Sequence, residues 1–149
     1  NALLDDRLDV IATDHAPHTW EEKQNSYFKA PSGIPLVQHS MLALLELYHN
    51  GVFSLETIVK KTSHAVAERF QVQDRGYIRE GYFADLVLLD LGKPYVVNDS
   101  NLLYLCGWSP FNGYRFHSTV EMTLVNGQIA WQNGQVTDQV LGKRLTFNR

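Results

Sequence analysis

A short apolar run that stops before a proline limits what the first part of this chain can fold into. Residues 8–12 are mostly apolar and include the β-branched Val10 and Ile11, a pattern that favours a buried strand. Pro17 cannot donate a hydrogen bond to a sheet and pushes the residue before it toward an extended backbone, so a strand must end here. Asp14, His15 and His18 are therefore predicted to stand on a stiff turn at a strand end. Such ends are where α/β barrels and open α/β sheets keep their chemistry.

The composition excludes several classes of protein. The chain has 149 residues, 44% apolar and 19% charged, which fits a globular domain with a real core. Its net charge of -3 gives no reason to expect binding to nucleic acid or to an anionic membrane. No apolar run reaches the roughly 18 residues of a membrane span, and no signal peptide is visible. Cys106 is the single cysteine, so no internal disulfide forms, and a reducing, cytoplasmic setting is expected.

The first half of the chain is predicted to be a strand followed by about three helices. Residues 19–29 are predicted to form a long loop over a site, and residues 30–35, with two prolines and a glycine, a rigid bend. Apolar residues recur at helical spacing over 36–48, and Asn50-Gly51 is a good helix stop. Ser54 is expected to cap a second helix, and Thr62 or Ser63 a third.

Near residue 75 the apolar period changes from 3.6 to 2, which predicts a small antiparallel sheet. Strands are expected at 82–90, 95–97 and 119–125. Asn-Gly pairs at 126–127 and 133–134 predict two tight hairpins. Residues 99–117 are expected to be irregular, and residues 137–149 a polar tail. The change of period predicts two structural units, residues 1–74 and residues 75–149.

Asp14 and His18 are close enough in sequence to converge on one ion or one small anion. A carboxylate can ligate a divalent metal and relay a proton, and an imidazole can ligate or donate to a substrate carboxylate. The spacing is equally compatible with a simple turn capped by Asp14, with both histidines on the surface. The spacing alone leaves both readings open.

Several segments resemble one enzyme family. Residues 12–18 (Ala-Thr-Asp-His-Ala-Pro-His), followed by Lys23, resemble the second signature of dihydroorotases, the zinc cyclic amidohydrolases of pyrimidine synthesis. Residues 30–35 resemble the substrate loop of that family. Residues 76–87 are similar to the return strand of amidohydrolases in general, and residues 109–113 and 125–127 are similar to the closing segment. The resemblance covers nearly the whole chain.

The resemblance implies an α/β fold. Residues 1–74 would be the last strand and helices of a TIM-type (β/α)8 barrel, and residues 75–149 the C-terminal half of a small flanking β-sandwich. It also implies the reversible, zinc-dependent hydrolysis of dihydroorotate to N-carbamoyl-aspartate.

The resemblance assigns roles to a few residues. Asp14 would be a metal ligand that takes a proton from the metal-bridging hydroxide and returns it to the departing amide nitrogen. His18 would bind the substrate carboxylate. Backbone groups of the substrate loop would hold the pyrimidine ring, which involves Ser32, Gly33, Ile34 and Pro35. His15 receives no role beyond the turn itself.

The chain departs from the family pattern in one respect. The His-x-His pair, the carboxylated lysine or aspartate and the two further histidines that precede this motif in relatives are not in it. We therefore expect a C-terminal portion of a longer enzyme with two zinc ions, most of whose ligands lie elsewhere. Such a portion would be inactive alone and prone to associate with further copies, since residues 8–12 would lack strand neighbours. The other histidines are expected to be structural or on the surface: His39, His49, His64 and His117.

Two other functions stay open. A hydantoinase or allantoinase would share the fold, but His18 favours a substrate that carries a carboxylate. A metal-free homologue that scaffolds a partner enzyme is the second alternative. Cys106 has no nearby base and is predicted to be a packing residue, as are the aromatics of residues 104–116.

Overall fold

The computed structural model describes residues 1–137 and 142–148. Its helices come first: α1 (Trp20–Lys23), α2 (Ser40–His49), α3 (Leu55–Val59), the π-helical turn η1 (Lys60–His64) and α4 (Ala65–Phe70). Its strands follow: β1 (Leu86–Asp90), β2 (Tyr95–Val96), β3 (Arg115–Phe116), β4 (Thr119–Val125), β5 (Gln128–Gln132) and β6 (Gln135–Val136). A short 3-10 turn, η2 (Asp99–Asn101), lies between β2 and β3.

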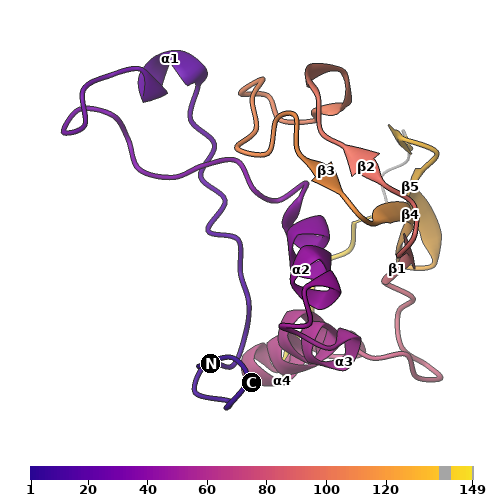
Figure 1. The fold of residues 1–149 in the computed structure, drawn as a ribbon. Helices are drawn as coiled ribbons and strands as arrows, with labels where there is room; N and C mark the ends of the chain where they lie inside the picture. The colour runs from indigo at the N-terminus through magenta and orange to yellow at the C-terminus, as the bar shows by residue number, and fades with distance from the viewer. Residues whose placement is uncertain (138–141, 149) are drawn as a thin grey trace.

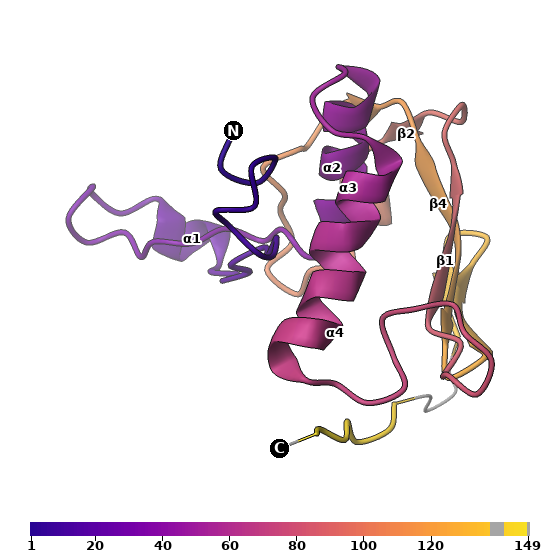
Figure 2. The ribbon, with the colours of Figure 1, turned by 90° about the horizontal axis from the view of Figure 1, so that it is seen from below.

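Helices α2, α3 and α4 lie between the four-stranded sheet and the segment that carries α1 (Figures 1 and 2). Strands β1, β4, β5 and β6 form one antiparallel sheet in the order β1-β4-β5-β6, and β2 pairs with β3 in a second, two-stranded sheet. In Figures 1 and 2 the segment that carries α1 extends away from the helices on the side opposite the four-stranded sheet. Within the described residues, no helix has the length and apolar character needed to cross a membrane.

Both hairpins are confirmed. Asn126 and Gly127 have φ of +53° and +80°, and Asn133 and Gly134 have φ of +54° and +79°. Positive φ at both central residues is the type I′ geometry, whose twist matches that of the flanking strands. The first turn joins β4 to β5 and the second joins β5 to β6, and β4 has the predicted bounds.

The predicted strand over residues 8–12 is wrong. These residues do not form a strand. They make one backbone–backbone hydrogen bond to a later part of the described chain, in which the Ile11 N–H donates to the Lys61 carbonyl at 3.1 Å. A strand is stabilised by a row of hydrogen bonds to a neighbour, and a single bond to a helix does not supply it. The Asp14 turn therefore follows a segment without helix or strand structure.

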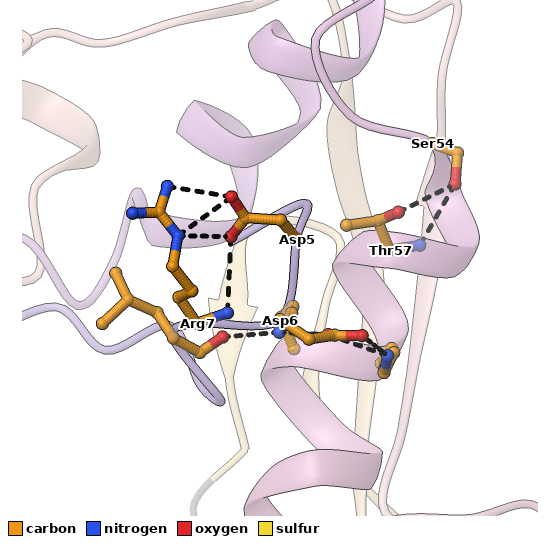
Figure 3. A network of polar contacts seen from close by, with 8 residues as sticks. Asp5, Asp6, Arg7, Ser54 and Thr57 are labelled. Atoms are coloured by element: carbon orange, nitrogen blue, oxygen red, sulfur yellow. Dashed lines mark hydrogen bonds and ion pairs between the residues drawn. The ribbon is translucent and has the colours of Figure 1, made fainter. Parts of the chain in front are cut away.

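The predicted third helix is also wrong as a separate element. α3, η1 and α4 are consecutive without a break (Figure 2), so neither Thr62 nor Ser63 caps a helix. The Thr62 hydroxyl donates instead to the Ile58 carbonyl at 2.7 Å, inside the helix. The Ser54 cap is confirmed: its Oγ accepts from the Thr57 N–H at 3.2 Å (Figure 3).

Other boundaries differ from the predictions because local capping and pairing move them. The predicted loop over 19–29 contains α1, which a capping box between Thr19 and Glu22 stabilises. α2 begins at Ser40 and not at residue 36, and β1 begins at Leu86 and not at residue 82. The irregular region contains η2 and β3. Of the predicted tail, residues 138–141 and 149 lie outside the described residues.

The best-packed core joins α2 to the smaller sheet. Leu42 of α2 is buried together with Val97 and Phe116, and partly buried residues surround the three: Ala43, Tyr95, Leu102, Phe111 and Val120. This core holds the start of α2 against the segment 98–111. Residues 36–39 join the predicted substrate loop, residues 30–35, to α2, so the core fixes the position of the segment that follows that loop.

Ion pairs join the N-terminal segment to η1, the middle part of the continuous helix from α3 to α4. The Asp6 carboxylate accepts from Lys60 Nζ at 2.9 Å and from Lys61 Nζ at 2.8 Å (Figure 3). The Lys61 side chain is 2% exposed, whereas that of Asp6 is 59% exposed. Lys61 also donates to the Leu8 carbonyl, so this buried cation has two acceptors.

Candidate functional site

Asp14 presents a free carboxylate on a left-handed turn. Its φ is +46°, a conformation that aspartate tolerates better than most residues, and the residue is exposed. Within the described part of the chain, no hydrogen bond or ion pair engages its side chain. A carboxylate left unpaired in this way can take up a proton or ligate a cation.

His18 lies at the other end of the same turn, where α1 begins. Its Nδ1 is 3.5 Å from Glu22 Oε2, and its carbonyl accepts from Trp108 Nε1 at 2.7 Å. The Thr19 N–H donates to the Glu22 carboxylate at 2.9 Å, and this bond leads the causes that lower the pKa of Glu22. Glu22 therefore stays ionised beside His18 and orients its ring through Nδ1, which leaves Nε2 for a ligand.

The predicted substrate loop, residues 30–35, and the two residues that follow it form one segment, the loop 30–37, which folds back onto this turn. Lys23 Nζ donates to the Pro31 carbonyl at 2.6 Å and to the Gly33 carbonyl at 3.1 Å. The Ala16 N–H donates to the Ile34 carbonyl at 3.2 Å, and His15 and Ile34 form an isolated parallel bridge. The structure thus brings together the two segments that the sequence singled out.

Gly33 is the point of closest approach between the loop and the turn. Its φ is +98°, and a Cβ built on it would lie 2.5 Å from Ala16 Cβ and 3.0 Å from the Ala16 carbonyl oxygen. A side chain does not fit here, so glycine is required for both conformation and space. Ser32 is exposed and Pro35 is buried, and within the described chain no hydrogen bond engages Ser32.

Two residues that the sequence did not assign to the site hold the far end of the loop: His15, which had no role beyond the turn, and Tyr104, which was predicted to be a packing residue. His15 Nδ1 accepts from the Leu36 N–H at 3.0 Å and from the Val37 N–H at 3.3 Å. The Tyr104 hydroxyl accepts from the Gln38 N–H at 3.0 Å, and its ring stacks on His15 with 5.7 Å between centroids. His15 could have been found from its place beside Asp14. Nothing in the local sequence marks Tyr104, which is 66 positions after Gln38.

The start of α2 is buried against the same segment. His39 has no exposed surface, and its Nδ1 is 3.3 Å from the Tyr104 hydroxyl and 3.4 Å from Ser109 Oγ. Burial lowers the pKa of His39, so the ring is neutral and can accept at Nδ1. Burial also raises the pKa of the Tyr104 hydroxyl, which remains protonated and can donate to His39.

The remaining histidines serve packing and hydrogen bonding. His49 Nε2 is 2.8 Å from Ser118 Oγ, and His64 stacks on Tyr77 with 4.1 Å between centroids. His117 Nδ1 is 2.9 Å from Glu46 Oε2. The contacts of these three histidines are all with residues outside the Asp14 turn.

The described residues do not form a metal site by themselves. A zinc site takes three or four protein ligands, and no group of three histidine, cysteine, aspartate or glutamate side chains in the described chain is suited to hold a metal ion. Asp14 therefore belongs to no group of described residues that could hold a metal ion.

Comparison with known proteins gives a consistent result. The model of the amidohydrolase family matches residues 38–131. A dihydroorotase of Halobacterium salinarum is 39% identical over 137 residues, which cover 91% of this chain and 32% of that protein. An allantoinase of Desulfitobacterium hafniense is 31% identical over 96% of this chain and 32% of its own length.

Solved structures agree with the fold. The L-hydantoinase of Arthrobacter aurescens superposes with a TM-score of 0.84 at 28% identity, over 91% of this chain and 31% of that one. The chain thus spans about a third of the length of the relatives that it matches. The resemblance to dihydroorotase-like amidohydrolases is confirmed over most of the chain.

Proposed function

This chain belongs to the amidohydrolase family, and on that premise we propose that it is the C-terminal part of a dihydroorotase. The complete enzyme would hydrolyse the cyclic amide of dihydroorotate reversibly to N-carbamoyl-aspartate, a reaction of pyrimidine biosynthesis. Dihydroorotases recur among its relatives at 38–39% identity over most of the chain.

One observation carries the proposal: the loop 30–37 is fastened to the Asp14–His18 turn. Bonds from Lys23 and Ala16 to loop carbonyls join the loop to the turn that carries the Asp14 carboxylate and the His18 imidazole. A cyclic amide that carries a carboxylate needs such a combination, namely a group that moves a proton, a donor for the carboxylate, and backbone groups that hold the ring.

The residues divide these tasks. The exposed Asp14 carboxylate is the group that we propose to take up a proton and to return it to the departing amide nitrogen. His18 Nε2 is proposed to donate to the substrate carboxylate. Within the loop, the carbonyls of Gly33 and Ile34 are already bonded to the protein, so Ser32 and the N–H of Gly33 are the groups that we assign to the ring, with Pro35 as a rigid support.

We also propose that the complete enzyme is a zinc enzyme in which Asp14 is one ligand. When bound, zinc would supply an activated water at neutral pH. The described residues do not assemble a set of ligands for the metal, so its other ligands would come from outside them.

The proposal includes the architecture of the complete enzyme, a barrel with a β-sandwich beside it. Residues 1–74 would complete a TIM-type barrel, and residues 75–149 would be half of a β-sandwich beside it. The relatives are metabolic enzymes by name, and with a single cysteine, Cys106, we place the protein in the cytoplasm.

The test is a substrate comparison with the full-length protein. Its hydrolysis of dihydroorotate, hydantoin and allantoin is measured, together with the variants Asp14→Asn and His18→Gln. We expect dihydroorotate to be preferred, Asp14→Asn to lower kcat by at least about a hundredfold, and His18→Gln to act mainly on KM. Preference for a ring without a carboxylate would refute the proposal.

The hydantoinase or allantoinase reading has specific support from the allantoinase relative and the L-hydantoinase structure. The same comparison decides it, because His18→Gln should matter little for a substrate that lacks a carboxylate. A chain that turns over none of the three rings would instead favour a non-catalytic scaffold.

A further inference from the structure

Three consecutive backbone N–H groups, the last two of the loop 30–37 and that of Gln38 directly after it, all donate to side chains from other segments. The Leu36 and Val37 N–H groups donate to His15 Nδ1, and the Gln38 N–H donates to the Tyr104 hydroxyl. These N–H groups stand just before α2, which begins at Ser40.

The two acceptors support each other. The His15 and Tyr104 rings stack at 5.7 Å with 29° between their planes. Tyr104 is held in turn by its hydroxyl, which lies 3.3 Å from the Nδ1 of the buried His39. The Gln38 side chain adds a further link, since its amide donates to the Asn101 carbonyl and accepts from the Leu103 N–H.

The opposite end of the loop is held differently. There the carbonyls of Pro31, Gly33 and Ile34 are the bonded groups, with Lys23 and Ala16 as donors. The loop is thus fastened through its carbonyls at one end and through its N–H groups at the other. The exposed Ser32 lies within the first of these ends, next to the Asp14 turn.

We propose that His15 and Tyr104 are positioning residues that fix the substrate loop for the cyclic amide ring. The proposal rests on the proposed function. His15 does so through Nδ1, which accepts the N–H groups of Leu36 and Val37, and it needs no contact with the substrate. Tyr104 completes the row of acceptors from a segment distant in sequence. Because the loop would bind substrate and transition state alike, its displacement should raise KM and leave kcat nearly unchanged.

The experiment compares three variants in the full-length protein. His15→Phe keeps a flat ring beside Tyr104 but removes the acceptor, and we expect KM for dihydroorotate to rise about tenfold with kcat within about threefold. His15→Asn places an amide oxygen close to where Nδ1 stands and should restore KM to within about threefold of the wild type. Tyr104→Phe removes one acceptor and should raise KM about threefold. Tyr114→Phe, which removes a hydroxyl that donates to Glu46 and not to the loop, is the matched control and should leave KM unchanged.

Hydrogen exchange at single amides gives a readout that does not depend on activity. The Leu36 and Val37 amides should exchange faster in His15→Phe and at the wild-type rate in His15→Asn, while Tyr104→Phe should accelerate Gln38. Unchanged exchange in His15→Phe would overturn the proposal, as would faster exchange with an unchanged KM. Should the wild type lack activity on dihydroorotate while exchange responds as expected, the proposed function fails and the fastening of the loop stands.

Discussion

The contact between Gly33 and Ala16 predicts a large effect for the smallest possible substitution. In Gly33→Ala the new methyl group would lie 2.5 Å from Ala16 Cβ, at a φ of +98°. The positive φ costs about 1–2 kcal/mol for any residue with a Cβ. The overlap adds about 1–3 kcal/mol, because the backbone of the turn must move. We therefore expect the variant to lose about 2–5 kcal/mol of the free energy of unfolding, or to release the loop from the turn at that cost.

The assay is urea unfolding of the full-length protein, combined with hydrogen exchange over the loop 30–37. Gly51→Ala is the matched control, since Gly51 has a φ of +69° and nothing within 4 Å of the added Cβ. It should lose only the conformational part, about 1–2 kcal/mol. Ala16→Gly in the Gly33→Ala background removes the nearest contact and should recover about 1 kcal/mol or more in a double-mutant cycle. Equal losses at Gly33 and Gly51, or a cycle with no coupling, would refute the reasoning.

Three further predictions concern charged groups. Hydrogen bonds from Lys61 and then from Lys60 lower the pKa of Asp6 from 3.8 to about 2. The ionised Asp6 carboxylate therefore stabilises the fold above pH 3.8, and this contribution is lost as the pH falls toward 2. The free energies of unfolding of wild type and Asp6→Asn, measured against pH, should differ at neutral pH and converge in acid. Lys61→Met should lose about 1–3 kcal/mol in urea unfolding, because it leaves acceptors of a 2% exposed cation unpaired, whereas Lys60→Met, at a side chain 53% exposed, should lose less than about 1 kcal/mol. Burial by itself raises the pKa of Glu46, but the hydrogen bonds from the backbone and ring of His117 outweigh it and leave that pKa lowered. Wild type should therefore be more stable than Glu46→Gln above pH 4.5. Thermal unfolding measured against pH should show that this difference in stability shrinks below pH 4.5.

Local chemistry alone fixed part of the fold. The Asn-Gly pairs at 126–127 and 133–134 adopt positive φ in almost any context, so both hairpins could be predicted from the dipeptides. Ser54 was predictable as a cap because a serine before an apolar helical pattern can accept a hydrogen bond from an N–H group of the first helical turn. In the same way the residue types around Asp14 and the bend at 30–35 pointed to the candidate site.

Tertiary structure decided what depends on distant partners. Residues 8–12 have the composition of a strand, but a strand exists only where a neighbour offers a row of hydrogen bonds, and the described chain offers Ile11 a single bond to a helix. Thr62 can cap a helix or bond within one, and the continuity of α3 with α4 selected the second. His15 and Tyr104 meet only because the core around Leu42 brings segment 98–111 onto the start of α2. The sequence by itself thus determined the residues whose chemistry is local, and the tertiary structure determined which side chains hold the loop, because that choice requires contacts between segments that no short-range pattern records.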